Sequence, residues 1–355
     1  MSEGNVTGGL YFILHLLVEI ICFALLGSKY PVEYVSLTII LFDTFAFVPQ
    51  GVLGEIIFRF KKVDFASLAV AFIGISIFLF EAPNFYVHIV AILFLTIGNA
   101  ILHEYGAIET VRDSKGKLTP SAVFVAGGSF GVVLGKFYNK LNISLYFLLI
   151  LVVLLEVLVL YLKHRSKDRD ERLKHLAKVN ICRENIPVAV ILLSAFFVTA
   201  IRGFIGYAIP TSWCETVPDF FLLFFLMGTG KALGGILADR FGAGIVGVSS
   251  TLLCIPMIVL GRNVTVVSVI GVMLFSMTMA ITFGMTLNAL ENNPGIAFGI
   301  TTIGLYVGSM VPEFYRPDLT MACILVTVLS VVCSIFLFLT LKMSCNKKNE
   351  KRTVQ

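Results

Sequence analysis

Charged residues are scarce in this sequence: they make up 14% of its 355 residues, where a soluble domain carries roughly 25%. So little polar surface cannot cover a water-soluble protein of this length. Hydrophobic residues make up 57%, and long apolar runs recur from one end to the other. Backbone groups in a bilayer must satisfy each other's hydrogen bonds, and runs that are continuous rather than alternating favour helices over a barrel. The composition therefore predicts an α-helical membrane protein.

The motifs of several enzyme and binding classes are missing as well. There is no P-loop, which argues against nucleotide hydrolysis as an energy source. The seven Cys form no C-x-x-C pair, which argues against a disulfide framework or a metal site. Basic residues lie in short loops rather than on a folded basic face, so nucleic acid is not an expected partner. We therefore expect neither an enzyme nor a cofactor or metal.

Twelve apolar runs are each near the ~20 residues that a helix needs to cross a bilayer. The first run follows no basic segment and precedes no clear cleavage motif, so we interpret it as a retained span rather than a signal peptide. The predicted spans are 9–28, 35–58, 64–82, 86–108, 119–138, 143–162, 187–209, 218–237, 244–261, 264–287, 294–312 and 319–341.

The distribution of Lys and Arg predicts the orientation. With both termini in the cytoplasm, 20 of the 27 basic residues fall in inner segments and 5 in outer segments. Cytoplasmic loops carry the excess of Lys and Arg in membrane proteins. We therefore expect a multi-pass protein of the cell membrane, in contact with the lipid bilayer and monomeric, with both termini cytoplasmic.

The longest hydrophilic stretch follows the sixth predicted span and divides the chain into two halves. The predicted units are an N-terminal six-helix bundle (1–162), a charged cytoplasmic linker (163–186), a C-terminal six-helix bundle (187–342) and a basic cytoplasmic tail (343–355). Similar residues open the fifth helix of each half, namely Thr119-Pro120 with Phe124 and Asn293-Pro294 with Phe298. This repetition predicts two bundles related by pseudo-twofold symmetry.

A short pattern stands at the inner end of the eighth predicted span. It runs Gly, three residues, Asp, Arg, any residue, Gly, and its residues are Gly235, Asp239, Arg240 and Gly242. This segment resembles the loop signature of the major facilitator superfamily of transporters. The corresponding loop of the first half keeps Gly54 and Arg59 but has Phe58 where the acidic residue is expected.

The resemblance implies a twelve-helix transporter fold whose inner loops open and close. In such a machine Asp239 pairs with a cation of a neighbouring helix, and Arg59 and Lys231 belong to the same inner gate. The resemblance also implies that helices one, four, seven and ten border a central cavity. Glu19 and Arg202 would then face each other across it, and an anionic substrate would compete with Glu19 for Arg202.

Other polar residues in the predicted spans are candidates for the pathway, because ionisable groups inside a bilayer are costly. His15 lies four residues before Glu19 and shares its helix face. His103 and Glu104 lie towards the inner part of span four, where His103 is a candidate proton relay. Asp43 and Asn288 complete the set. Static ion pairs and helix-packing hydrogen bonds are the alternatives for these residues.

The function predicted from these features is secondary active transport of a small solute by alternating access, with protons as a candidate coupling ion. The sequence does not choose between symport and antiport. A membrane scaffold or sensor that resembles a transporter without transporting is the alternative, because the first inner loop departs from the signature.

Overall fold

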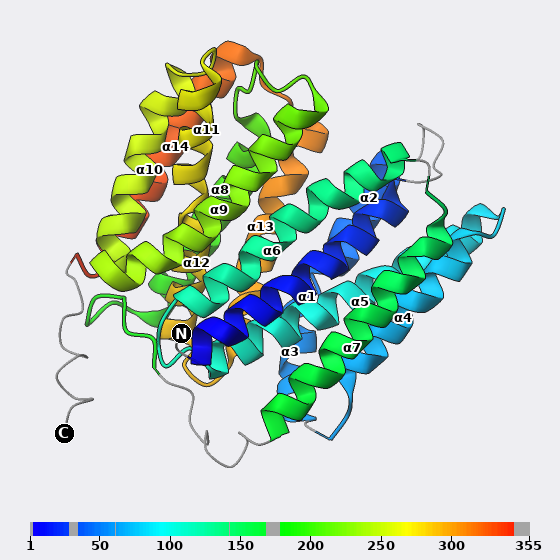
Figure 1. Cartoon of the computed structure of the whole chain (residues 1–355). Coiled ribbons are helices and arrows are strands. Elements are labelled where there is room, and N and C mark those ends of the chain that lie inside the picture. Colours follow the sequence, from blue (N-terminus) through cyan, green and yellow to red (C-terminus); the bar gives the residue numbers. More distant parts are fainter. Residues whose placement is uncertain (1–2, 28–34, 61, 142, 168–177, 344–355) are drawn as a thin grey trace.

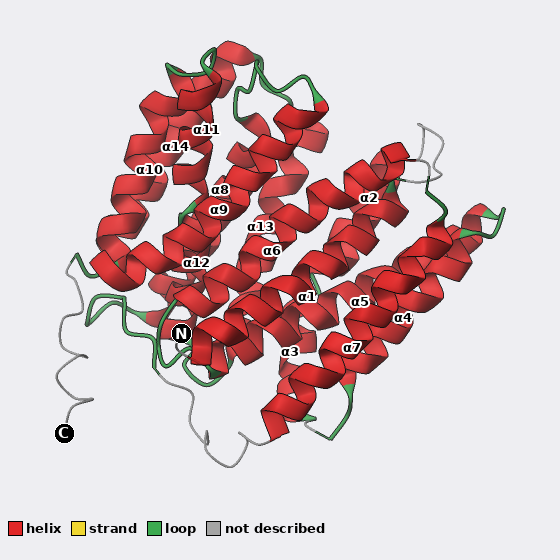
Figure 2. Ribbon diagram, in the orientation of Figure 1, coloured by secondary structure: helices red, strands yellow, loops and turns green. Residues whose placement is uncertain are grey.

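The structure is a computed structural model that describes residues 3–27, 35–60, 62–141, 143–167 and 178–343. The long helices are α1 (Glu3–Leu26), α2 (Val35–Phe47), α3 (Gln50–Arg59), α4 (Phe65–Phe80), α5 (Phe85–Arg112), α6 (Thr119–Tyr138), α7 (Leu148–Lys167), α8 (Val188–Ala208), α9 (Val217–Phe241), α10 (Ala243–Val259), α11 (Thr265–Ser276), α12 (Thr278–Ala289), α13 (Pro294–Phe314) and α14 (Leu319–Thr340). In this described part of the chain there is no strand (Figure 2).

Each predicted span contains a helix, and two of the spans are interrupted. The second is split into α2 and α3 at Pro49, which has no backbone N–H to continue the helix. The tenth is split into α11 and α12 at Met277. Ten of the described segments are long and apolar enough to cross a membrane, while α4 and α10 are apolar but shorter. The chain is therefore a multi-pass membrane protein.

Figure 1 shows α1 to α7 on one side of the molecule and α8 to α14 on the other. Within the first group α1 lies along α6, where the glycines of α6 allow the two backbones to touch. A Cβ on Gly127 or Gly135 would meet the carbonyl of Phe12 or Ile20. The glycines that dilute the hydropathy of the fifth predicted span are thus the residues that let α6 pack closely against α1.

Among the described helices, two pairs make the most extensive contacts between the N-terminal and the C-terminal group. α6 runs beside α9, and α3 runs beside α13. In the second pair Gly51 lies against Gly299 and Gly54 lies against Gly295. A Cβ on Gly54 would stand 2.6 Å from Cα of Gly295, so nothing larger than hydrogen fits between these backbones.

Gly54→Val should therefore destabilise the protein. The added methyl groups would meet backbone atoms that cannot rotate away, and such overpacking costs typically about 1–3 kcal/mol. We expect a lower thermal midpoint for the purified variant in detergent. Gly206→Val is the matched control, because no atom lies within 4 Å of a Cβ at that position. Equal midpoints for the two variants would contradict the close packing of α3 and α13.

The charged linker is only partly within the described residues. Its first residues extend α7 to Lys167, and residues 168–177 lie outside the described part, as do residues 344–355 of the predicted basic tail. The end of the linker is held against the C-terminal helices. Asn288 Oδ1 accepts hydrogen bonds from the backbone N–H of Ile181 (2.9 Å) and Cys182 (2.8 Å).

Candidate functional site

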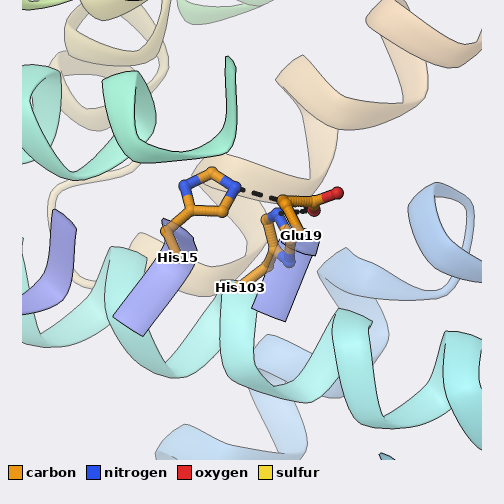
Figure 3. A group of neighbouring side chains, drawn as sticks. All are labelled: His15, Glu19 and His103. Atoms are coloured by element: carbon orange, nitrogen blue, oxygen red, sulfur yellow. Dashed lines mark ion pairs between the residues drawn. The ribbon is translucent and has the colours of Figure 1, made fainter. Parts of the chain in front are cut away.

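Two histidines and one glutamate meet in the buried interior between α1 and α5 (Figure 3). His15 and Glu19 stand one turn apart on α1, as their spacing predicted, with His15 Nε2 3.8 Å from Glu19 Oε1. His103 comes from α5, and its Nε2 lies 3.2 Å from the same carboxylate oxygen. The rings of His15 and His103 touch edge to face, with centroids 4.3 Å apart. All three residues are buried, so none of them faces lipid.

Backbone contacts fix which nitrogen of each ring carries hydrogen. His15 Nδ1 lies 3.0 Å from the carbonyl oxygen of Phe124, and His103 Nδ1 lies 2.9 Å from that of Asn99. A carbonyl oxygen only accepts, so both Nδ1 atoms must donate. In a neutral imidazole the Nε2 atom is then an acceptor. Two nitrogen acceptors and a carboxylate therefore converge, and the group needs a shared cation.

A proton and a metal ion both satisfy that requirement chemically. The three donor atoms lie within 4.8 Å of one another, and two imidazoles with a carboxylate are common metal ligands. No metal site was predicted from the sequence, where the Cys form no C-x-x-C pair and His103 is distant from the other two residues along the chain. Asn99, which donates to Glu19 Oε1 (3.1 Å) and to Cys22 Sγ (3.4 Å), completes the polar group.

The expected pairing of Glu19 with Arg202 is wrong for the conformation described. Arg202 is 8% exposed on α8 and reaches the carbonyl oxygen of Ser276 (3.5 Å) and Sδ of Met279 (2.8 Å). Its contacts within the described residues include no carboxylate. The carboxylate of Glu19 is already held by His15, His103 and Asn99. The prediction rested on the similar depth of Glu19 and Arg202 in the bilayer. Similar depth does not determine whether two side chains meet.

Lys231 also differs from its predicted place at the inner gate. It lies eight residues before Asp239, which is about 12 Å along the helix axis. The neighbouring Gly230 packs against Met273 and Ser276 of α11, next to the carbonyl that Arg202 reaches. The charges that act on Lys231 come from Arg202 and Glu19. Lys231 therefore belongs with the interior charges.

Asp239 lies on α9, in the C-terminal group of helices, and accepts hydrogen bonds from the start of α6 in the N-terminal group. Its Oδ1 accepts from the backbone N–H of Leu118 (2.8 Å), and its Oδ2 accepts from the N–H (2.9 Å) and hydroxyl (2.6 Å) of Thr119. These N–H groups open a helix and have no partner within it, so Asp239 acts as an N-cap supplied by α9. The acid was expected to pair with a cation, and its partners are instead the donors at a helix end.

The two glycines of the loop signature around Asp239 each have a structural role. A Cβ on Gly235 would collide with Ala122 of α6, so this glycine lets α9 approach α6. Gly242 has a φ of 100°, a conformation that favours glycine, and it ends α9 where α10 begins. Arg240 stacks over the ring of Phe241, 5.2 Å from its centroid.

Two solved structures with a similar arrangement of helices are of the transporter FucP. A variant of the E. coli fucose:proton symporter FucP aligns over 94% of this chain and 97% of its own, with a TM-score of 0.64 and 13% identity. FucP in the outward conformation, described as a Major Facilitator Superfamily transporter, aligns over 94% and 98%, with a TM-score of 0.61 and 14% identity. The chain has the major facilitator fold. No model of a known protein family matches the sequence, and no curated protein does.

Within the major facilitator fold, two other predicted site residues take structural roles. Asn288, predicted to line the pathway, binds the linker backbone as described above, because it stands at the end of α12 beside residues 181 and 182. Arg59, predicted for the inner gate, is exposed and pairs with Glu55 of its own helix, 2.5 Å away. Its position at the last turn of α3 suits the helix dipole.

Glu104 and Asp43 have no hydrogen-bond or ion-pair partner in the described part of the chain. Glu104 is completely buried, and its carboxyl stands where Gly54 of α3 meets Gly295 of α13. Neither of its oxygens has a hydrogen-bond partner among the described residues. Asp43 lies on α2, where the charges that act on it are those of Glu19, Glu313 and Lys136.

Asn99 and Met279 were not predicted as site residues, and Ser276 was considered only for its hydroxyl group. Asn99 had a readable signal, since it precedes His103 by four residues and so shares its helix face. The contacts of Ser276 and Met279 with Arg202 were not predictable, because they are made by a backbone carbonyl and a sulfur atom. Neither group belongs to a charge pattern.

Proposed function

We propose that this chain is a secondary transporter that moves a small solute across the cell membrane by alternating access, coupled to protons. The site that carries the proposal is the buried group of His15, Glu19 and His103. Its three converging acceptors require a cation, and a proton bound there can leave when the group meets water of different pH. The fucose:proton symporter with the same fold couples its solute to protons, which supports the same energy source here.

A proton is favoured over a metal ion by the contact between Glu19 and His103. Their 3.2 Å separation is within the reach of a hydrogen bond and has the geometry of one shared proton. Elemental analysis of the purified protein distinguishes the two cations. The proposal predicts less than stoichiometric zinc or other transition metal, and one metal per chain that Glu19→Gln removes would overturn the proton assignment.

The proposal takes the chain as two six-helix bundles, 1–162 and 187–342, related by a pseudo-twofold axis. It is supported by corresponding contacts across the molecule. Asp239 and Gly235 of α9 meet the start of α6, while Gly54 of α3 meets the start of α13. Both of these helices begin at the repeated Thr-Pro or Asn-Pro pair. With the termini in the cytoplasm, these contacts lie at the inner end.

Alternating access needs contacts at one end that can break. At this end the contacts of α9 with α6 and of α3 with α13 include backbone groups and glycines. Such surfaces can separate without leaving large apolar cavities. We propose that the described conformation is closed at the inner end, and that separation of these two pairs opens it.

Solute uptake into proteoliposomes tests the proposed function as a whole. Purified protein is reconstituted and offered a panel of labelled small solutes with and without an inward proton gradient. The expected result is accumulation of at least one solute, faster with the gradient than without it. Uptake equal to that of protein-free vesicles for every solute would support a scaffold or sensor instead.

A further inference from the structure

Arg202 is a buried cation, and no anion balances it among the residues that the structure describes. Its Nε has no hydrogen-bond partner among the described residues, and its other contacts are a carbonyl at 3.5 Å and a thioether sulfur at 2.8 Å. A buried guanidinium normally gains hydrogen bonds from a carboxylate or an equivalent acceptor, because removing its charge from water is costly. This side chain therefore has hydrogen-bonding capacity left for a ligand.

Lys231 brings a second positive charge to the same region. Gly230, its neighbour on α9, would place a Cβ 3.0 Å from Cβ of Ser276, and Ser276 supplies the carbonyl that Arg202 reaches. Lys231 is half-buried in this packing. No hydrogen bond or ion pair joins it to another residue in the described part of the chain. Two cations from α8 and α9 thus flank the interruption of the tenth span at Met277.

The one acid whose charge acts on Lys231 among the described residues is already engaged. Glu19 is the carboxylate whose charge acts on Lys231, but both histidines and Asn99 hold its oxygens. One carboxylate cannot balance two cations and also satisfy two histidines. Among the described residues, Arg202 and Lys231 therefore have no carboxylate left to balance their charge.

We infer that Arg202 and Lys231 bind the negatively charged group of the transported solute, which is a carboxylate or a phosphate. This inference rests on the proposed transport function. The planar fork of Arg202 matches two oxygens of such a group, and Lys231 adds a point charge without directional demands. The anion would lie beside the His15–Glu19–His103 group, so its charge would stabilise a proton bound there. Anion and proton would then enter together.

Binding to the purified full chain in detergent tests this inference without requiring transport. Acetate, succinate, inorganic phosphate and glycerol phosphate are titrated at constant ionic strength, with L-fucose as the neutral comparison, and the shift of the thermal midpoint is followed. We expect a saturable rise with at least one anion and none with fucose. No saturable rise with any anion, or a rise with fucose alone, would overturn the inference.

The variants locate the anion within the protein. Arg202→Gln should weaken binding at least about tenfold, which is about 1.4 kcal/mol, and Arg202→Lys should also weaken it, because the fork is lost while the charge is kept. Lys231→Gln should weaken it several-fold. Arg262→Gln is the control. Arg262 donates a hydrogen bond to the carbonyl oxygen of Val259, the last residue of α10, and does not contact Arg202. Anion binding that survives Arg202→Gln unchanged would overturn the assignment.

The outcomes separate this inference from the proposed function. A protein that takes up a neutral solute with protons, but binds no anion, remains a transporter whose solute class has been assigned wrongly. A protein that binds an anion through Arg202, but transports nothing in proteoliposomes, keeps the anion site and loses the transport function.

Discussion

Glu19→Gln is expected to abolish proton-driven accumulation of solute while leaving exchange of solute across the membrane. The amide cannot carry the negative charge that draws a proton to His15 and His103, yet it has the shape of the carboxyl group and still accepts from Asn99. An inward proton gradient should therefore no longer raise the rate of uptake, a loss of about tenfold or more if coupling supplies at least about 1.4 kcal/mol.

Counterflow exchange in the same vesicles is the internal control, since it needs the solute site and alternating access but no net proton movement. Glu156→Gln is the matched variant, because Glu156 is also a glutamate within a predicted span but lies on α7, outside the cluster. A Glu19→Gln protein that keeps the full response to the gradient would exclude the proposed proton site. Loss of both activities in Glu156→Gln would instead point to a general effect of removing a buried charge.

Asp239→Asn is expected to have the second large effect, on the balance between conformations. The aspartate accepts three hydrogen bonds at the start of α6, and hydrogen bonds to charged groups are each worth about 1.5–3 kcal/mol. An amide nitrogen in place of one oxygen would face an N–H donor. The closed inner end should then lose at least about 1.4 kcal/mol relative to the open one, a shift of at least about tenfold.

Spin labels at Lys117 and Phe241, exposed residues beside this contact, would report the shift as a longer distance distribution. Asp318→Asn provides the matched control. Asp318 caps α14 by accepting from the backbone N–H of Met321, 2.8 Å away, so its loss weakens one helix without affecting a contact between the two sides. Identical distance distributions for wild type and Asp239→Asn would contradict the role of Asp239 in closing the inner end.

Hydropathy was sufficient to locate the helices, because a bilayer imposes one length and one kind of backbone bonding on every span. Pairing within a helix was also predictable, as His15 and Glu19 show, since one turn fixes their relation. The approach of His103 to Glu19 depends on how α5 packs against α1. That packing follows from contacts between residues far apart in the sequence, which spacing along the chain does not encode.

The errors have the same origin. Depth in the membrane placed Glu19 and Arg202 at one level, but the rotation of α8 about its axis turns Arg202 towards Ser276. Asp239 was expected to pair with a cation. A sequence shows which residues are charged, but not which backbone N–H groups are free at the start of a helix. The Thr119-Pro120 pair that marks the start of α6 was visible in the sequence, and its relation to Asp239 was not.

Nitrogen NMR of the protein labelled at histidine tests the central claim most directly. Single His→Gln variants assign the signals of His15 and His103. The account predicts hydrogen on Nδ1 of both rings at every pH, and a shared proton at Nε2 whose titration changes in Glu19→Gln. Rings without hydrogen on Nδ1, or a titration that is the same with and without the Glu19 carboxylate, would contradict it.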